Sequence, residues 1–339
     1  MLLTETGPVS EGRDSLVLSD VAEPEPREGE VLLQVAACGV CHTELDEIEG
    51  RTPPSHLPMI PGHQVIGEIV ARGAGVTGVT VGQRVGVAWI FWACGHCERC
   101  AAGDENLCAG FRATGRDANG GYAEYMTVPA AFAHEIPECF GDAEAAPLLC
   151  AGAVGYRSLR LTAIRNGMRL GLTGFGASGH LVMMMVRHRY PDTEVYVFAR
   201  QQEEREFALQ SGATWVGDTL EPAPAKLHAI IDTTPAWLPL VKALENLEPG
   251  GRLVVNAIRK EDADRPQLLS LDYPRHLWLE KEIKSVANVT RRDVREFLDL
   301  AAAIPIRPVI ETYALHDANR ALRDLKLKHV RGAKVLCAR

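Results

Sequence analysis

The sequence predicts an α/β protein that combines a β-rich part with a parallel-sheet part. Residues 1 to about 150 are dense in Gly, Pro and Val and hold short apolar runs separated by turn residues, which is typical of strands. From about residue 152, short apolar strands alternate with helices, which is typical of a parallel sheet with crossover helices. A chain of 339 residues is long enough for two such domains.

The expected elements follow the apolar runs in chain order. Strands of the first part are predicted at 31–36, 65–70 and 84–88. The second part is predicted to hold strands at 169–173, 195–199, 229–232, 252–256 and 283–287, with helices at 180–189 and 203–210. A helix at 292–302 and a last strand at 333–336 return to the character of the first part. We therefore expect a β-rich domain at 1–152 and 288–339, interrupted by an α/β domain at 153–287.

Composition and charge narrow the class of protein. Hydrophobic residues make up 46% and charged residues 24%, and the net charge of -8 argues against a nucleic-acid partner. No apolar run is long enough to span a bilayer or to act as a secretory signal. We expect a cytoplasmic protein, and its nine cysteines are then better explained by metal binding than by disulfide bonds. Three of them, Cys38, Cys139 and Cys337, are expected to pack as small apolar residues.

Four other cysteines fall within fifteen residues, at Cys94, Cys97, Cys100 and Cys108. This spacing lets one loop bring four sulfurs to a tetrahedral zinc ion, and four thiolates without an acid or base indicate a closed, structural site. Free thiols are a poor alternative because unliganded clusters invite oxidation. A nucleic-acid zinc ribbon fits poorly too, because it needs two pairs on a longer hairpin in basic surroundings.

A glycine-rich turn follows the strand predicted at 169–173 and opens the next helix. Its residues form the G-x-G-x-x-G pattern of a dinucleotide-binding turn and include Gly174, Phe175, Gly176, Ala177 and Gly179. The first glycine allows the tight turn, the second lets the backbone approach the pyrophosphate, and the third allows the helix to pack closely. A purely structural turn is the alternative.

The end of the next strand bears on which dinucleotide binds. An acid at this place grips the adenosine ribose of NAD, but the sequence has Ala199 followed by Arg200. Without the acid, the 2'-phosphate of NADP is not repelled, and Arg200 could pair with it. NADP is therefore favoured over NAD, with Arg200 as a solvated surface charge as the alternative.

A second metal site is expected around Cys41, with His63 and Cys150 as its partners. Each of these residues alone would more often be a packed core or surface side chain. Together they would give the three-ligand zinc site with one open position that catalysis requires. A dehydrogenase needs an electrophile to stabilise an alkoxide, and such a zinc ion provides one.

These motifs occur in the order of a known family. Gly-Val-Cys-His-Thr at 39–43, Gly62-His63, the four-cysteine loop, Cys150-Ala-Gly and the 174–179 turn resemble the zinc-dependent medium-chain alcohol dehydrogenases, near the short microbial, yeast-type and cinnamyl-alcohol-type branch. The resemblance covers nearly the whole chain. It implies a GroES-like catalytic domain with both zinc sites, a Rossmann domain, and the cofactor in the cleft between them.

The resemblance also implies roles for single residues. Thr43 would take the substrate proton and pass it to the nicotinamide ribose, with Asp46 at the position that ends the proton relay. His42 would lie near the cofactor pyrophosphate, and Val154 stands where a Thr often packs against nicotinamide. Trp89 would form an aromatic wall of the substrate pocket, with core packing as the alternative.

Several positions depart from the family's usual pattern. Glu44 replaces the Asp that orients the ligand His, and its longer arm could still reach. Gln64 stands where a Glu commonly follows that His, and Asp46 stands where many relatives carry a His. None of these changes removes a metal ligand, so they bear on rate, pH optimum and substrate.

The sequence thus predicts a zinc-dependent enzyme, with two zinc ions per chain, that transfers a hydride between NADP(H) or NAD(H) and a primary or secondary alcohol or aldehyde. The aromatic run at 89–92 favours an apolar aliphatic or aromatic substrate. A polyol or sugar dehydrogenase on the same scaffold and a non-catalytic nucleotide-binding sensor remain the alternatives. A homodimer or homotetramer is expected from the resemblance.

Overall fold

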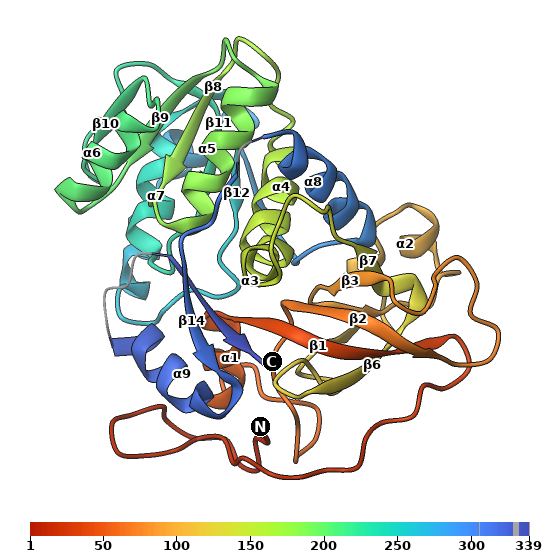
Figure 1. Cartoon of the computed structure of the whole chain (residues 1–339). Helices are drawn as coiled ribbons and strands as arrows, with labels where there is room; N and C mark the ends of the chain where they lie inside the picture. Colours follow the sequence, from red (N-terminus) through yellow and green to blue (C-terminus); the bar gives the residue numbers. More distant parts are fainter. Residues whose placement is uncertain (305, 328–331, 339) are drawn as a thin grey trace. The chain divides into compact units, whose positions relative to one another are not determined.

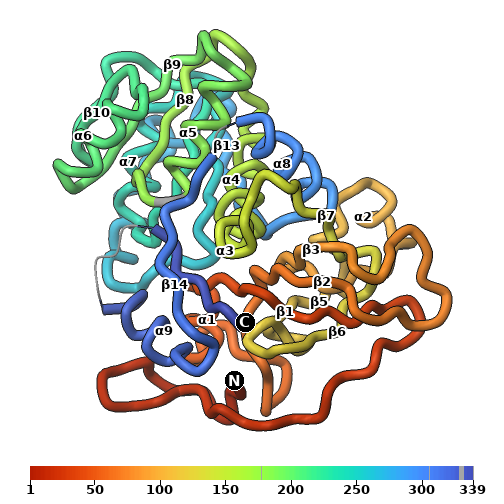
Figure 2. The backbone as a smooth tube through the Cα atoms, in the orientation of Figure 1, coloured from red at the N-terminus to blue at the C-terminus, as the bar shows by residue number. Residues whose placement is uncertain are grey.

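The computed structural model describes every residue except 305, 328–331 and 339, and the side chain of Ala177 lies outside the described part. The chain forms two compact units, and Figures 1 and 2 trace its path through them. The first contains Met1–Cys150, Val289–Ala302 and Arg307–Arg339, and the second contains Ala151–Asn288 and Ala303–Ile306. None of the helices in the described residues has both the length and the apolar character to cross a membrane.

The first unit is built on a seven-stranded sheet with the order β14-β15-β1-β2-β3-β7, in which β6 also pairs with β1. Its strands are β1 (Glu30–Val40), β2 (Val65–Arg72), β3 (Arg84–Val87), β6 (Tyr125–Pro129), β7 (Ala133–Glu135), β14 (Ile310–Ala314) and β15 (Ala333–Cys337). A separate two-stranded sheet pairs β4 (Ile90–Trp92) with β5 (Arg112–Ala113). Both sheets are antiparallel apart from the parallel pair β14 and β15.

The central strand of this sheet is β1, which pairs with β2, β6 and β15. Most of its residues are buried, as expected of a strand with neighbours on both edges. The strand ends at Val40 and passes the chain directly to Cys41, the first residue of the predicted catalytic site. The sheet therefore fixes the position of that residue.

Helices of the first unit are short near the N-terminus and longer near the C-terminus. They are α1 (His42–Ile48), α2 (Glu98–Ala101), α3 (Asp142–Ala145), α8 (Arg291–Ala303) and α9 (Ala318–Leu327). Single 3-10 turns occupy Glu105–Leu107, Ala130–Phe132, Ala146–Leu149 and Leu315–Asp317.

The second unit holds a six-stranded sheet with the order β10-β9-β8-β11-β12-β13, and all of its pairs are parallel. Its strands are β8 (Arg169–Thr173), β9 (Glu194–Phe198), β10 (Trp215–Gly217), β11 (Leu227–Asp232), β12 (Leu247–Val255) and β13 (Glu282–Ser285). Its helices are α4 (Ala151–Thr162), α5 (Ala177–Arg189), α6 (Gln202–Gln210) and α7 (Trp237–Asn246), followed by a 3-10 helix (Arg265–Ser270) and a π-helix (Tyr273–Leu277).

Counted within the unit, this strand order is 3-2-1-4-5-6, the doubly wound arrangement of dinucleotide-binding folds. The order reverses between β8 and β11, and such folds bind their ligand outside the carboxyl ends of the strands at that point. The predicted fold class, an α/β chain with an inserted parallel sheet, is confirmed.

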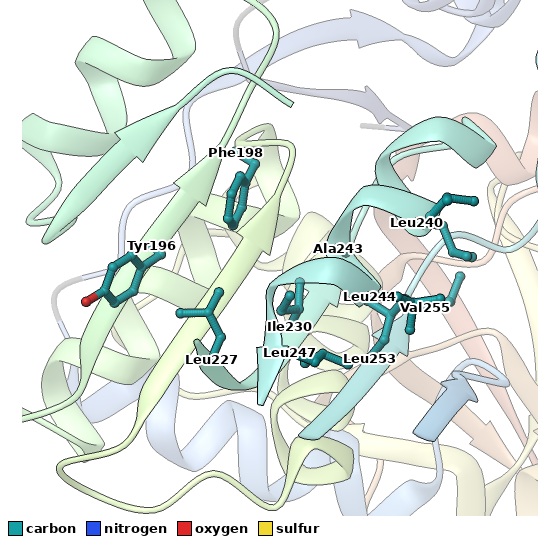
Figure 3. Packing of buried hydrophobic residues seen from close by; sticks show 11 residues of the cluster. Tyr196, Phe198, Leu227, Ile230, Leu240, Ala243, Leu244, Leu247, Leu253 and Val255 are labelled. Carbon is teal, nitrogen blue, oxygen red and sulfur yellow. The ribbon is translucent and has the colours of Figure 1, made fainter. Parts of the chain in front are cut away.

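One part of the core of the second unit lies where α7 covers the sheet. Figure 3 shows Leu240 and Leu244 of α7 among side chains from β9, β11 and β12, including Phe198, Ile230 and Leu253. Burial of these apolar side chains, each worth about 1.5–3 kcal/mol when complete, holds the sheet against the helix.

Candidate functional site

Cys41, His63 and Cys150 come together in the first unit. Cys41 caps the N-terminus of α1, His63 precedes β2, and Cys150 follows the 3-10 turn Ala146–Leu149. Their ligand atoms all lie within 4.8 Å of one another, and Cys41 Sγ is 3.8 Å from His63 Nε2. Tetrahedral zinc with ordinary Zn–S and Zn–N bonds would place a sulfur and a nitrogen ligand about 3.6 Å apart. The three side chains therefore fit a zinc ion without rearrangement.

Glu44 supports the ligand histidine from behind. Its Oε1 lies 2.5 Å from His63 Nδ1, and its Oε2 accepts a hydrogen bond of 2.9 Å from the backbone N–H of Cys41. The longer arm of Glu44 does reach the histidine. Both side chains are fully buried, and this contact leaves Nε2 of His63 as the ring nitrogen that could bind a metal ion.

The electrostatic field at this site favours a cation. Burial alone would lower the pKa of His63, but the interactions with Glu44 and with the sulfur of Cys41 outweigh it and raise that pKa well above its ordinary value. In the same way, burial opposes the charged form of Glu44, yet His63 keeps the pKa of Glu44 below its ordinary value. A bound zinc ion would meet the same negative groups.

Gly62 places His63, because only glycine fits at this position. Its φ is +99°, and an added Cβ would lie 2.4 Å from the ring of Tyr122. Gln64 follows His63 and is only 3% exposed. The position at which the family commonly carries a Glu therefore holds a buried, uncharged amide in this chain.

His42 and the two residues of the predicted proton path, Thr43 and Asp46, all belong to α1. His42 is exposed at the first helical position, and Thr43 is 7% exposed with its N–H 3.4 Å from Cys41 Sγ. Asp46 is 2% exposed, and its Oδ1 accepts a hydrogen bond of 2.6 Å from Nε of Arg51. Thr43 thus lies beside a metal ligand, whereas the carboxylate of Asp46 is engaged by a cation.

Of the aromatic run at 89–92, Trp89 alone remains a candidate for the substrate pocket. Ile90 and Phe91 are core residues, 0% and 5% exposed, whereas Trp92 is 37% exposed and lies near Gly110, just after the four-cysteine loop. Trp89 is partly buried, and its Nε1–H points to Oε1 of Glu47 at 3.5 Å. Glu47 was not foreseen from the sequence, although its spacing from Thr43 and Glu44 puts it on their side of α1.

The second cysteine cluster also forms as expected. The sulfurs of Cys94, Cys97, Cys100 and Cys108 lie within 4.8 Å of one another, and Sγ of Cys94 is 3.9 Å from Sγ of Cys100. Four thiolates around zinc are about 3.8 Å apart. The backbone N–H groups of His96 and Cys97 lower the pKa of Cys94 to about 6, which favours its thiolate. The set fits a closed zinc site.

The three remaining cysteines differ from one another. Cys38 is 1% exposed and packs in β1 as predicted, and Cys337 is partly buried. The prediction is wrong for Cys139, which is exposed. Cys139 lies between the end of β7 and α3, where the connecting loop runs over the surface.

The glycine turn of the second unit has the conformation that its pattern predicts. Gly174 has φ +77°, and a Cβ there would meet Oγ1 of Thr233 at 2.8 Å. A Cβ at Gly179 would lie 2.9 Å from the carbonyl oxygen of Gly174, so the third glycine packs the helix against the turn itself. Nothing lies within 4 Å of a Cβ at Gly176, so the backbone there is open. The side chain of Phe175 is buried, with 2% of the residue exposed, so only the backbone of this residue could contact a ligand.

The end of β9 carries a second cation that the sequence did not single out. Ala199 is buried and Arg200 is exposed. Arg205 of α6 donates from Nη1 to the carbonyl oxygens of Ala199 at 2.7 Å and Arg200 at 3.0 Å. Arg205 also forms an ion pair with Asp218 at 3.5 Å.

Comparisons with known proteins identify the family. The family model described as "Alcohol dehydrogenase GroES-like domain" matches residues 27–138 of this chain. A relative described as "Probable alcohol dehydrogenase AdhA" of Mycobacterium tuberculosis (strain CDC 1551 / Oshkosh) is 42% identical over 335 residues, which cover 97% of this chain and 94% of that protein. The chain belongs to the zinc-dependent medium-chain alcohol dehydrogenases. An alcohol dehydrogenase of Geobacillus stearothermophilus is 32% identical to this dehydrogenase over 337 residues, 97% of each chain.

Solved structures agree with this assignment. A cinnamyl alcohol dehydrogenase of Sorghum bicolor superimposes on the dehydrogenase with a TM-score of 0.81 and 26% identity, covering 98% of this chain and 96% of the other. A cobalt- and zinc-bound alcohol dehydrogenase of Pyrobaculum aerophilum gives a TM-score of 0.81 and 25% identity, covering 99% and 100%. The family predicted from the motifs is therefore confirmed.

Proposed function

We propose that the dehydrogenase interconverts apolar alcohols and aldehydes at a zinc ion held by Cys41, His63 and Cys150, with NADP(H) favoured over NAD(H). The observation that carries this proposal is the convergence of two thiols and one imidazole, with Glu44 fixing the imidazole, at the end of the central strand β1. Three ligands leave a fourth position for substrate oxygen, where zinc supplies an electrophile for the developing negative charge. Cys94, Cys97, Cys100 and Cys108 would hold a second, structural zinc ion.

Thr43 is proposed to move the proton. It follows the ligand Cys41 by two residues, and its backbone N–H contact with Sγ of Cys41 fixes the first turn of α1. Its hydroxyl would accept the proton from the substrate hydroxyl and pass it on. Asp46 is proposed as the end of this path, where its Oδ1 is paired with Arg51.

The cofactor is proposed to bind at the carboxyl ends of β8 and β9. The open backbone at Gly176 begins α5, whose N-terminal N–H groups would bind the pyrophosphate. Gly174, Ala177 and Gly179 complete the turn, with His42 and Val154 as proposed further contacts. Nicotinamide supplies the hydride acceptor or donor.

The preference for NADP rests on the charges at the end of β9. The residue directly after this strand is Ala199 rather than an acid, and two guanidinium groups lie nearby, on Arg200 and Arg205. A phosphate on the adenosine ribose would find positive charge, and the ribose of NAD would lack its usual carboxylate partner.

An initial-rate comparison tests the proposal. Purified protein would be assayed with NADPH and NADH against aliphatic and aromatic aldehydes, before and after zinc is removed by a chelator. We expect NADPH-dependent reduction that is lost with the metal and restored by zinc. Full activity without zinc would contradict the mechanism, and binding of NADPH without consumption of any aldehyde would instead identify a sensor.

We also propose a homo-oligomer, because β13 leaves one edge of the parallel sheet without a partner strand among the described residues. All four of its residues are exposed, and the exposed apolar residues Trp278, Leu279 and Ile283 lie on or beside it. Unpaired edges of this kind associate readily. Light scattering on the purified protein measures the oligomeric state.

A reducing, cytoplasmic location is proposed because all nine cysteines are free.

A further inference from the structure

Glu47 is a carboxyl group that the fold buries at a cost. It is 1% exposed, its Oε2 has no hydrogen-bond partner, and its Oε1 accepts only the long bond of 3.5 Å from Trp89. Burial, reinforced by the charge of Glu44, raises the pKa of Glu47 to about 8. A polar group buried without its full set of partners destabilises a protein, so an apolar side chain of similar size would serve the core better.

The position of Glu47 connects it with the proposed catalytic zinc site. It lies on α1 three residues after Glu44, which holds His63, and four residues after Thr43. Residues at these spacings are neighbours on a helix surface. The carboxyl group therefore belongs to the same short helix and the same side as the groups that support the metal and the proton path.

Glu47 also contacts Trp89, which is held by two further contacts to its ring and one to its backbone. Phe111 packs against it with ring centroids 5.2 Å apart, and the guanidinium of Arg116 lies 5.1 Å from its centroid. The backbone carbonyl of Trp89 accepts a hydrogen bond of 2.8 Å from Thr114. Phe111 and Arg116 would hold any aromatic ring, and Glu47 alone of these binds the N–H edge that distinguishes Trp.

We propose that Glu47 is a positioning residue for substrate specificity, which sets the orientation of the Trp89 ring and thereby the side groups that fit beside it. The inference rests on the proposed function, because it takes Trp89 as a wall of the substrate pocket. It explains why a carboxyl group occupies a place where an apolar residue would be more stable. Residues that cost stability in this way are typical of functional sites.

Substrate selectivity and stability together test this role. The variants are Glu47→Leu, Glu47→Gln and Trp89→Phe, and the readouts are the ratio of kcat/KM for cinnamaldehyde and butanal, the zinc content and the thermal midpoint. For Glu47→Leu we expect two zinc ions per chain, an unchanged or higher thermal midpoint, and a ratio shifted by about fivefold or more, which corresponds to about 1 kcal/mol. Glu47→Gln keeps an acceptor for the indole and should restore part of the wild-type ratio.

A double-mutant cycle adds a second test. In the Trp89→Phe background, which lacks the N–H, Glu47→Leu should change the ratio no further. Glu49→Gln is the matched control: it removes a carboxylate from the end of the same helix, where the partners are Arg51 and Lys326, and should leave the ratio unchanged.

Two outcomes would overturn the inference: a ratio within about twofold of wild type, whatever the thermal midpoint, or additive effects of the two substitutions. These outcomes are separable from failure of the proposed function. A wild-type protein that reduces no aldehyde refutes the proposed function, whereas an active wild type with an unchanged ratio in Glu47→Leu refutes only the role of Glu47.

Discussion

Arg291 at the start of α8 grips Glu105 inside the four-cysteine loop through three separate donors. Its backbone N and its Nε donate to Oε1 at 2.7 and 3.0 Å, and Nη2 donates to Oε2 at 2.6 Å. Glu105 is 6% exposed, and the Arg291 guanidinium also lies 4.7 Å from the ring centroid of Phe132. The loop that carries the proposed structural zinc is thereby fastened to a helix 186 residues further along the chain.

Arg291→Ala should destabilise the first unit. The loss would leave a nearly buried carboxylate with fewer partners, and because the Arg291 side chain is 31% exposed, we expect about 1–3 kcal/mol rather than the full cost of a broken buried pair. The thermal midpoint should fall by several degrees. Arg292→Ala is the control, since its pair with Glu296 is exposed and should contribute less than about 1 kcal/mol. Equal effects of both substitutions would contradict the prediction.

Cys150→Ala should remove one zinc ion and leave the other. Metal analysis is expected to give one zinc per chain instead of two, with aldehyde reduction lost and NADPH binding retained. Cys38→Ala provides the comparison, because Cys38 is a buried cysteine near the site that is not placed as a ligand. Retention of two zinc ions by Cys150→Ala would show that Cys150 is not a ligand.

Glu44→Gln should weaken the catalytic metal site without touching the ligands. Glutamine keeps the length of the side chain but removes the charge that favours the present orientation of His63. Losses of this kind lower metal affinity by about 10–100-fold. Competition with a zinc chelator measures the affinity, and the second zinc ion proposed for the four-cysteine loop should be unaffected. Glu44→Asp restores the usual family residue but shortens the arm, so it should bind zinc less tightly than wild type.

His134 in β7 should make stability depend on pH. Burial, with the charges of Arg295 and Arg291, lowers its pKa to about 4, against a smaller opposing effect of Glu105. Its unfolded pKa is about 6.5, so between pH 6.5 and 4 the unfolded chain binds a proton that the folded chain does not. Stability therefore falls as the pH is lowered through this window, by up to about 3 kcal/mol.

The variant His134→Leu isolates this contribution. Loss of zinc in acid affects both proteins, so the informative quantity is the difference in unfolding free energy between wild type and variant at pH 7.5, 6 and 5. We expect the unfolding free energy of the variant to rise relative to that of the wild type as the pH falls. A difference that stays constant across this range would exclude His134 as the cause.

Ala199→Asp should change the cofactor preference. A carboxylate at the end of β9 would repel a 2'-phosphate and grip a free ribose hydroxyl, so the ratio of kcat/KM for NADPH and NADH should fall by about tenfold or more. Arg200→Glu should act in the same direction. Arg165→Glu is the control, because it makes the same charge change as Arg200→Glu but before the start of β8, at the amino ends of the parallel strands rather than at their carboxyl ends. A wild type that prefers NADH would refute the assignment.

Local patterns predicted the elements that carry strong signals of their own. The strand predicted at 169–173 coincides with β8, because a compact apolar run is ended by the glycine turn. Helices α4 and α7 were not foreseen, since Gly152 and Gly155 interrupt the first and Pro239 stands inside the second. β12 begins at Leu247, five residues before the predicted start. The difference arises because Pro249 and the two glycines after it are typical of turns and not of the start of a strand.

The ligand residues were predictable and their surroundings were not. Cys41, His63 and Cys150 stand in recognisable motifs, but whether Glu44 reaches the histidine depends on distances that only the folded chain defines. Glu47 and Glu49 belong to the same run of acids, yet one is fully buried beside Trp89 and the other faces Arg51 and Lys326. Helical spacing could have placed Glu47 on the side of Thr43, but not its burial.

The pairing of β1 with β15 has a consequence for how the protein is made. Residues 37–40, which lead directly to Cys41, pair with residues 334–337 at the other end of the chain. On a ribosome, the second unit from β8 to β13 can assemble while synthesis continues, because its strands lie within one continuous stretch. The seven-stranded sheet of the first unit cannot be completed until β15 has left the ribosome. We therefore expect nascent chains that are stalled before residue 333 to bind the dinucleotide well before they can hold the catalytic zinc ion tightly.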